Sequence, residues 1–144
     1  MIFQRINRED AEKVFLIVYN VAGATITANY PAVWDTGTAD GVRVTKPATA
    51  TLGLFVGLAN KDIADSSYGM VQAYGYRASG FVTNDTTIAI TAGNPLKCVA
   101  AQWYLTNGST GDGLGGMVYA GEAYATAVTT LAAGANKKCF VRAL

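Results

Sequence analysis

Apolar and polar side chains alternate along most of this chain, and turn-forming residues interrupt the alternation about every 8–12 residues. Residues 42–45 alternate cleanly between the turn Asp40-Gly41 and Pro47, while residues 14–20 are β-branched and aromatic and end at Ala22-Gly23. A period of two is that of a β-strand, whereas an amphipathic helix needs 3.6. The spacing therefore predicts an all-β fold, either a small β-barrel or a β-sandwich, and disfavours an alternating α/β fold.

The segments predicted as strands have turn residues at their ends. They are residues 14–20, 24–27, 32–34, 42–45, 52–58, 69–76, 81–83, 86–90, 98–105, 117–119, 123–129 and 138–144. Short helices are predicted over residues 8–13 and, for one turn, around residues 62–65. Alanine alternates with threonine, valine and glycine near residue 125, which predicts a strand packed closely against another sheet. A helix over residues 122–133 is the alternative that this alanine content permits.

The length of 144 residues predicts one domain, in which a second core would be hard to fit. Hydrophobic residues make up 51% of the chain and charged residues 15%, so the chain should fold. We expect an N-terminal segment over residues 1–13, which could serve as an interaction arm, and a single β domain over residues 14–144. The N-terminal residues lack the apolar core of a signal peptide, which predicts that the chain stays in the cytosol where it is made. The longest apolar run, residues 14–19, is too short to span a bilayer, so we expect no membrane partner.

Composition also limits the chemistry. The chain has no histidine, which excludes Ser-His-Asp and Cys-His catalysis and histidine-ligated zinc. A net charge of +1 argues against nucleic-acid binding by phosphate neutralisation. We therefore expect no enzyme activity, no cofactor, no metal site and no nucleic-acid partner.

Two motifs match catalytic or binding patterns by letter. Asp35-Thr36-Gly37 follows apolar residues, as the catalytic loop of an aspartic protease does, and a single copy would require a dimer. The favoured interpretation is a strand end followed by a turn, in which Asp35 or Thr36 bonds backbone amides. The glycines of residues 111–116 match the dinucleotide-binding pattern, but no acidic residue follows at the required distance, so a surface loop is predicted.

Three chemically distinctive side chains lie in apolar stretches. Cys98 and Cys139 are predicted to be buried free thiols, and a disulfide between neighbouring strands is the alternative. Glu122 is the carboxylate that lies in an apolar stretch rather than beside a turn or in the N-terminal segment. Burial of that carboxylate requires a partner, so a structural partner is predicted for it.

The order of residues resembles that of the small proteins that decorate the heads of tailed bacteriophages. The stretches that carry the resemblance are residues 18–26 leading to Ala32-Val33-Trp34-Asp35, residues 39–47, residues 53–59 with 62–64 and 68–75, and the terminal residues 138–144. The resemblance implies a non-catalytic virion protein, made in the host cytoplasm, that binds the outer surface of the capsid and stabilises the shell. It also implies the major capsid protein as partner and a homo-oligomer, a trimer or a dimer.

The candidates for contact with the capsid are charged and polar residues of the N-terminal segment and of the loop that begins near residue 107. They are Arg5, Arg8, Lys13, Asn107 and Asp112. Three alternatives stay open: another small phage head-completion, tail or fibre component, a non-viral β module that binds sugars or peptides, and the dimeric aspartic protease.

Overall fold

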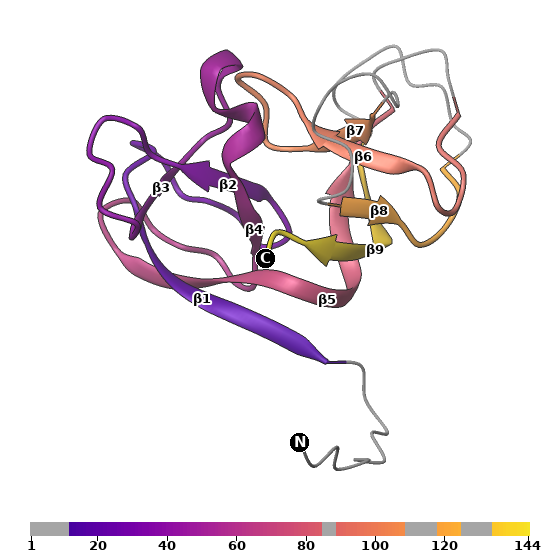
Figure 1. The fold of residues 1–144 in the computed structure, drawn as a ribbon, viewed down its shortest axis with the longest axis horizontal. Helices are drawn as coiled ribbons and strands as arrows, with labels where there is room; N and C mark the ends of the chain where they lie inside the picture. Colours follow the sequence, from indigo (N-terminus) through magenta and orange to yellow (C-terminus); the bar gives the residue numbers. More distant parts are fainter. Residues whose placement is uncertain (1–11, 85–88, 109–117, 125–133) are drawn as a thin grey trace, which may run out of the picture.

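A computed structural model describes residues 12–84, 89–108, 118–124 and 134–144. Within these ranges the chain forms nine β-strands in one sheet and a single short 3-10 helix, with no α-helix (Figure 1). The prediction of an all-β fold is therefore confirmed. The strands are β1 (Lys13–Asn20), β2 (Pro31–Trp34), β3 (Arg43–Thr45), β4 (Phe55–Ala59), β5 (Tyr68–Val82), β6 (Pro95–Cys98), β7 (Leu105–Asn107), β8 (Val118–Ala120) and β9 (Ala135–Arg142), and the 3-10 helix is η1 (Thr49–Leu54).

The long strand β5 organises the sheet. Its first half pairs with β1 and β4, and its second half pairs with β9 and, at its end, with β7. The pairings thus form two circuits that share β5, one through β1, β3, β2 and β4 and the other through β7, β6, β8 and β9. The two groups of strands lie on either side of the molecule in Figure 1. The sheet is not a single closed barrel, which was one of the two predicted architectures.

The buried apolar side chains form two clusters rather than the one core expected from the length. One cluster contains Val18, Val44 and Val71 of the first circuit, and the other contains Leu105 and Val141 of the second. The strands β2 and β4 contribute to both clusters and separate them.

In β4, Phe55 and Leu58 face one cluster while Val56 and Ala59 face the other, because a bulge opposite Ala32 shifts the alternation. A strand buried on both faces needs a continuous apolar sequence, and every residue of β4 is buried. This explains why residues 55–59 show no polar alternation.

Several predicted elements differ from the structure. The strand predicted over residues 98–105 is wrong, because β6 ends at Cys98 and the chain turns with a positive φ of 60° at Ala101 before β7. The segments 69–76 and 81–83 are parts of the one strand β5. The first residues of the predicted strand 52–58 belong to η1.

Two further predictions were wrong near the first circuit. Residues 24–27 form only an isolated bridge, between Ile26 and Ile63, instead of a strand. That bridge also replaces the helical turn expected around residues 62–65. Three further predictions concern residues that lie largely outside the described ranges. They are the helix over residues 8–13, the strand over residues 86–90 and the strand or helix within residues 122–133.

Candidate interaction surface

The β1–β5 pair presents apolar side chains to the outside of the molecule. The register sets Ile17 opposite Met70 and Tyr19 opposite Tyr68, so these four side chains lie on one face of the pair. Leu16 and Val18 alternate to the other face and pack in the first cluster. We call Phe15, Ile17, Tyr19, Tyr68 and Met70 the outer apolar face.

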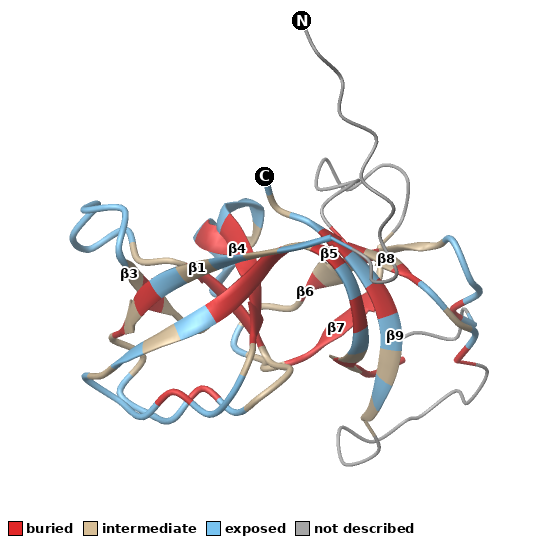
Figure 2. Ribbon diagram, turned by 90° about the horizontal axis from the view of Figure 1, so that it is seen from below, coloured by how far each residue is buried: buried red, intermediate tan, exposed pale blue. Residues whose placement is uncertain are grey.

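The outer apolar face is unusually exposed for large side chains. Ile17 is 71% exposed, Tyr68 69% and Met70 46%. Figure 2 views the molecule from the side on which β1 and the first half of β5 lie and shows exposed positions along both strands. Contiguous exposed apolar residues of this kind are typical of a contact surface rather than of a solvated strand.

One end of this face borders a hollow of about 340 Å³ lined by Tyr19, Tyr68, Asp40, Val42 and Arg43. The two tyrosine rings meet edge to face with their centroids 4.9 Å apart. Asp40 lies 3.1 Å from the Nε of Arg43. The backbone N–H groups of Val42 and Arg43 donate to Asp40 and lower the pKa of that carboxyl, so the acid stays charged.

The other end borders a hollow of about 200 Å³, where Lys13 and Phe15 lie beside Arg77. Arg77 is buried, and it donates hydrogen bonds to the carbonyl oxygens of Ser79 (2.7 Å) and Ala59 (2.6 Å). Burial lowers the pKa of the Arg77 guanidinium. Because the guanidinium is so fully bonded, it fixes the backbone around this hollow.

The amide of Gln72 completes this polar cluster. Its Oε1 accepts a 3.3 Å hydrogen bond from Arg77, and its Nε2 donates to the carbonyl oxygens of Tyr74, Gly75 and Tyr76. These carbonyls lie at the bend of β5, where pairing passes from β1 to β9. The cluster therefore stabilises the bend on which the orientation of the outer apolar face depends.

The structure places only two of the five predicted contact residues. Lys13 is the exposed first residue of β1, and Asn107 is the half-buried last residue of β7. These two strands lie at opposite edges of the molecule in Figure 1, so the structure does not bring them together. Arg5, Arg8 and Asp112 lie outside the described residues.

The outer apolar face and Arg77 were not among the predicted contact residues. The available signal was the uninterrupted apolar run of residues 14–19. A strand with one buried face alternates with polar residues, so a run apolar at every position indicates a second apolar face.

The predicted turn at Asp35-Thr36-Gly37 is confirmed. Strand β2 ends at Trp34, and the Asp35 carboxylate accepts hydrogen bonds from the backbone N–H groups of Gly37 and Thr38, each at 3.2 Å. Glu122 has the predicted structural partner, since its Oε1 accepts a 2.7 Å hydrogen bond from the backbone N–H of Lys138. Its side chain is half-buried rather than buried. The glycine pattern at residues 111–116 lies outside the described residues.

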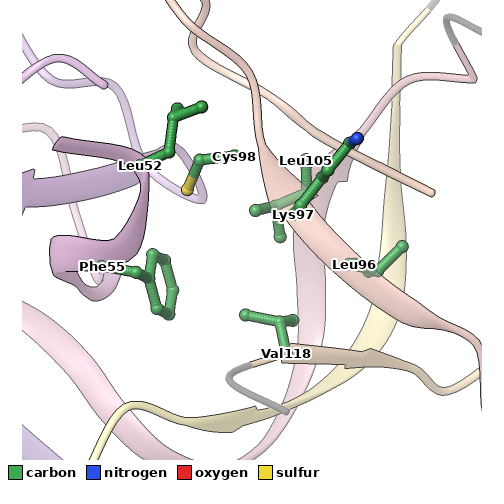
Figure 3. A pocket seen from close by; sticks show the side chains of 7 residues that line it. All are labelled: Leu52, Phe55, Leu96, Lys97, Cys98, Leu105 and Val118. Atoms are coloured by element: carbon green, nitrogen blue, oxygen red, sulfur yellow. The ribbon is translucent and has the colours of Figure 1, made fainter. Parts of the chain in front are cut away.

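Cys98 and Cys139 are buried free thiols, as predicted. Burial raises the pKa of each thiol to about 12, so neither is a nucleophile at neutral pH. Cys98 lines a gap of about 10 Å³ among the apolar side chains of Leu52, Phe55 and Leu105 (Figure 3). A gap of that volume holds about one water molecule, so it is a packing defect of the core and no ligand site.

No group of three or more Cys, Asp or Glu side chains within residues 12–84, 89–108, 118–124 and 134–144 could hold a metal ion. Over the same residues, no helix has the length and apolar character that crossing a bilayer requires.

The fold is similar to that of a solved phage protein, described as the head fiber gp8.5 N base in bacteriophage phi29. The likeness covers 92% of this chain and 96% of that chain, with a TM-score of 0.52 and 13% sequence identity. At this identity the likeness concerns the fold. No protein-family model matches the sequence, and no curated protein matches it.

Proposed function

We propose that this chain is a structural, non-catalytic component of a bacteriophage particle, attached to the outside of the head. The observation that carries the proposal is the likeness of nearly the whole chain to nearly the whole of a phage head fibre base. The resemblance of the sequence to head decoration proteins rests on different data, the order of residues, and points to the same part of the particle. The proposed location is the capsid surface, and the proposed partner is the major capsid protein.

Within this role we favour a decoration protein that stabilises the shell. An apolar contact surface of modest size suits a protein present in many copies, because multivalent attachment multiplies weak contacts. A head fibre component is the second candidate, favoured by the description of the fold neighbour.

Quantitative mass spectrometry of purified particles tests this proposal. Copies of this chain near the number of shell proteins, or a simple fraction of it, support decoration. A handful of copies per particle contradicts decoration and favours a tail or portal component. Complete absence contradicts the virion role. Electron microscopy of the same particles separates a decoration protein from a fibre base, since a fibre projects from the shell.

The outer apolar face is the surface that we propose for contact with the shell. Tyr68 is an aromatic side chain of this face that is 69% exposed, and exposed tyrosines are frequent anchors of interfaces. When purified protein is added to particles that lack this chain, the Tyr68→Ser variant should co-sediment with the particles in fewer copies than the native protein. Leu54→Ser is the matched control, because Leu54 is exposed on η1, outside this face. Equal occupancy of both variants would exclude the outer apolar face as the contact.

The N-terminal segment is the second contact that we propose. Deletion of residues 1–10 removes Arg5 and Arg8 and leaves β1 complete. Reduced occupancy of the shortened chain on the particles would support a contact by the N-terminal segment, and unchanged occupancy would exclude that contact.

A β module that binds sugars is a further candidate, favoured by one observation. The hollow at Tyr19 and Tyr68 combines two aromatic rings with the Asp40–Arg43 ion pair, and sugar sites need both apolar faces and polar groups. Titration with simple sugars, followed by tyrosine fluorescence, tests it. No change in fluorescence with any sugar would exclude this candidate.

A further inference from the structure

Within the part of the chain that the structure describes, one edge of strand β1 is open along most of its length. On one side it pairs with β5 from Lys13 to Tyr19, but on the other side β3 covers only Tyr19 and Asn20. Among the described residues, no strand pairs with residues 13–18 on that second side. In Figure 1 this part of β1 extends along the lower edge of the molecule, beyond β3.

The hydrogen bonds of Tyr19 and Asn20 show which backbone N–H and C=O groups of β1 point to the open edge. The N–H of Tyr19 donates to Val42 on the β3 side, whereas the N–H of Asn20 donates to Ser67 on the β5 side. Because successive residues of a strand direct their N–H and C=O groups to opposite edges, those of Phe15 and Ile17 lie on the open edge.

The sequence of this edge lacks the features that normally prevent strand addition. Proteins protect open edges with charged residues, proline or short strands. Residues 14–19 contain neither charge nor proline and combine β-branched with aromatic side chains. By contrast, the part of β9 that extends past its partner β8 carries Lys137. An uncovered edge of this kind is an aggregation hazard, which favours its coverage by a specific strand.

We propose that the open edge of β1 pairs antiparallel with the same edge of a second copy of this chain, forming a symmetric dimer. The N–H and C=O groups of Phe15 and Ile17 of each copy bond across the interface.

Charge and symmetry favour a second copy as the occupant. Lys13 is the only charged residue of β1 and lies at its end, so antiparallel pairing keeps the two ammonium groups far apart. A two-fold axis also covers both open edges with one contact, because each copy offers the same segment.

This interface leaves the outer apolar face accessible. Pairing edge to edge continues the sheet and joins the two outer apolar faces into one larger surface. A single strand pair buries less than a standard interface, so the dimer should be reversible and depend on concentration. The inference does not rest on the proposed function, and its test needs no phage particle.

Light scattering coupled to size exclusion, over a wide range of concentrations of the purified full chain, measures the dimer directly. We expect a species with twice the mass of the chain to appear as concentration rises. Ile17→Pro removes only an N–H on the open edge, which edge strands tolerate. It should raise the dissociation constant about tenfold or more, because each dimer loses two hydrogen bonds.

Two lysine variants distinguish edge pairing from packing of the apolar faces. Ile17→Lys places a charge on the open edge at a side chain that is already 71% exposed, so the fold should persist if the proline variant unfolds. Met70→Lys is the matched control, since Met70 lies opposite Ile17 on the same face but in the paired strand β5. Edge pairing predicts that Ile17→Lys weakens the dimer and that Met70→Lys retains it.

Three results would overturn the proposal. One is a chain that stays monomeric at every concentration, which would indicate that the open edge pairs with a strand of another protein instead. The second is a dimer that Ile17→Lys leaves intact. The third is a dimer that Met70→Lys abolishes, which would indicate contact between the apolar faces.

Discussion

The guanidinium of Arg77 donates a 2.6 Å hydrogen bond to the side-chain oxygen of Asn29, which lies 48 residues earlier in the chain. Asn29 adopts a positive φ of 74°, and its backbone bonds both neighbouring strands, donating to Ala59 at 2.9 Å and accepting from Phe81 at 3.1 Å. The pair therefore ties the loop before β2 to β4 and β5, where the two circuits of strands meet. The stability of the whole sheet should depend on it.

Removal of the Arg77 guanidinium tests this dependence. Arg77→Met removes the hydrogen bonds that the guanidinium donates to oxygens of Asn29, Ala59, Gln72 and Ser79, so the free energy of unfolding should fall by about 3 kcal/mol or more. Arg43→Met is the control, because Arg43 makes its ion pair with Asp40 at the surface, and its loss should be much smaller. Urea unfolding measures both, and similar losses in the two variants would contradict the role assigned to Arg77.

Gly75 lies where β5 passes the start of β1, and its φ is 102°. A Cβ at this position would overlap the carbonyl oxygen of Glu12 in addition to straining the backbone. Gly75→Ala should therefore destabilise the protein by about 3 kcal/mol. Gly23→Ala, also at positive φ but with open space around its Cβ, should cost about 1 kcal/mol, the strain alone. Equal losses of stability in the two variants, measured by thermal unfolding, would mean that the approach of β1 to Gly75 imposes no constraint.

The all-β class could be predicted because the alternation and the turn residues act locally. The extent of β5 could not, because polar and small residues, Arg77 to Gly80, interrupt the alternation in its middle. Their place in the strand depends on distant partners: Gly80 leaves room for the Sγ of Cys139, and Arg77 bonds Asn29 and Ala59. The division into two clusters depends in the same way on the bulge in β4, which the sequence does not mark.

The candidate surface shows the same limit. That residues 14–19 form a strand follows from their composition, but which side of it faces solvent depends on the register with β5. Selecting charged residues therefore gave Lys13, at the end of β1, and missed Ile17 in the middle of β1 and Tyr68 at the start of β5. Charge indicates exposure from the sequence alone, whereas an exposed apolar residue is recognisable only after pairing is known.

The two thiols should be unreactive in the folded protein. Cys98 is 4% exposed and Cys139 is fully buried, so a thiol reagent such as dithionitrobenzoate should label neither at neutral pH. Labelling of two thiols per chain should follow unfolding in urea. Rapid labelling of either cysteine before unfolding would show that its cluster opens readily.

The same burial should make stability fall at alkaline pH. Burial raises the pKa of each thiol to about 12, from an ordinary value of 9.0. Between these values the unfolded chain loses thiol protons that the folded chain keeps, so rising pH favours unfolding. Two thiols with fully separated pKa values contribute a decrease of about 3 kcal/mol per pH unit within that window. Below pH 9 the contribution vanishes, because both states are protonated.

Replacing both cysteines isolates this contribution from the titration of tyrosine and lysine. The variant Cys98→Ala/Cys139→Ala should be less stable at neutral pH, because each substitution leaves a small cavity in an apolar cluster. Its free energy of unfolding should nevertheless fall less steeply than that of the native chain between pH 9 and 11, when both are measured in urea. Parallel pH profiles for the two proteins would mean that the thiols titrate equally in the folded and unfolded states and would contradict their raised pKa values.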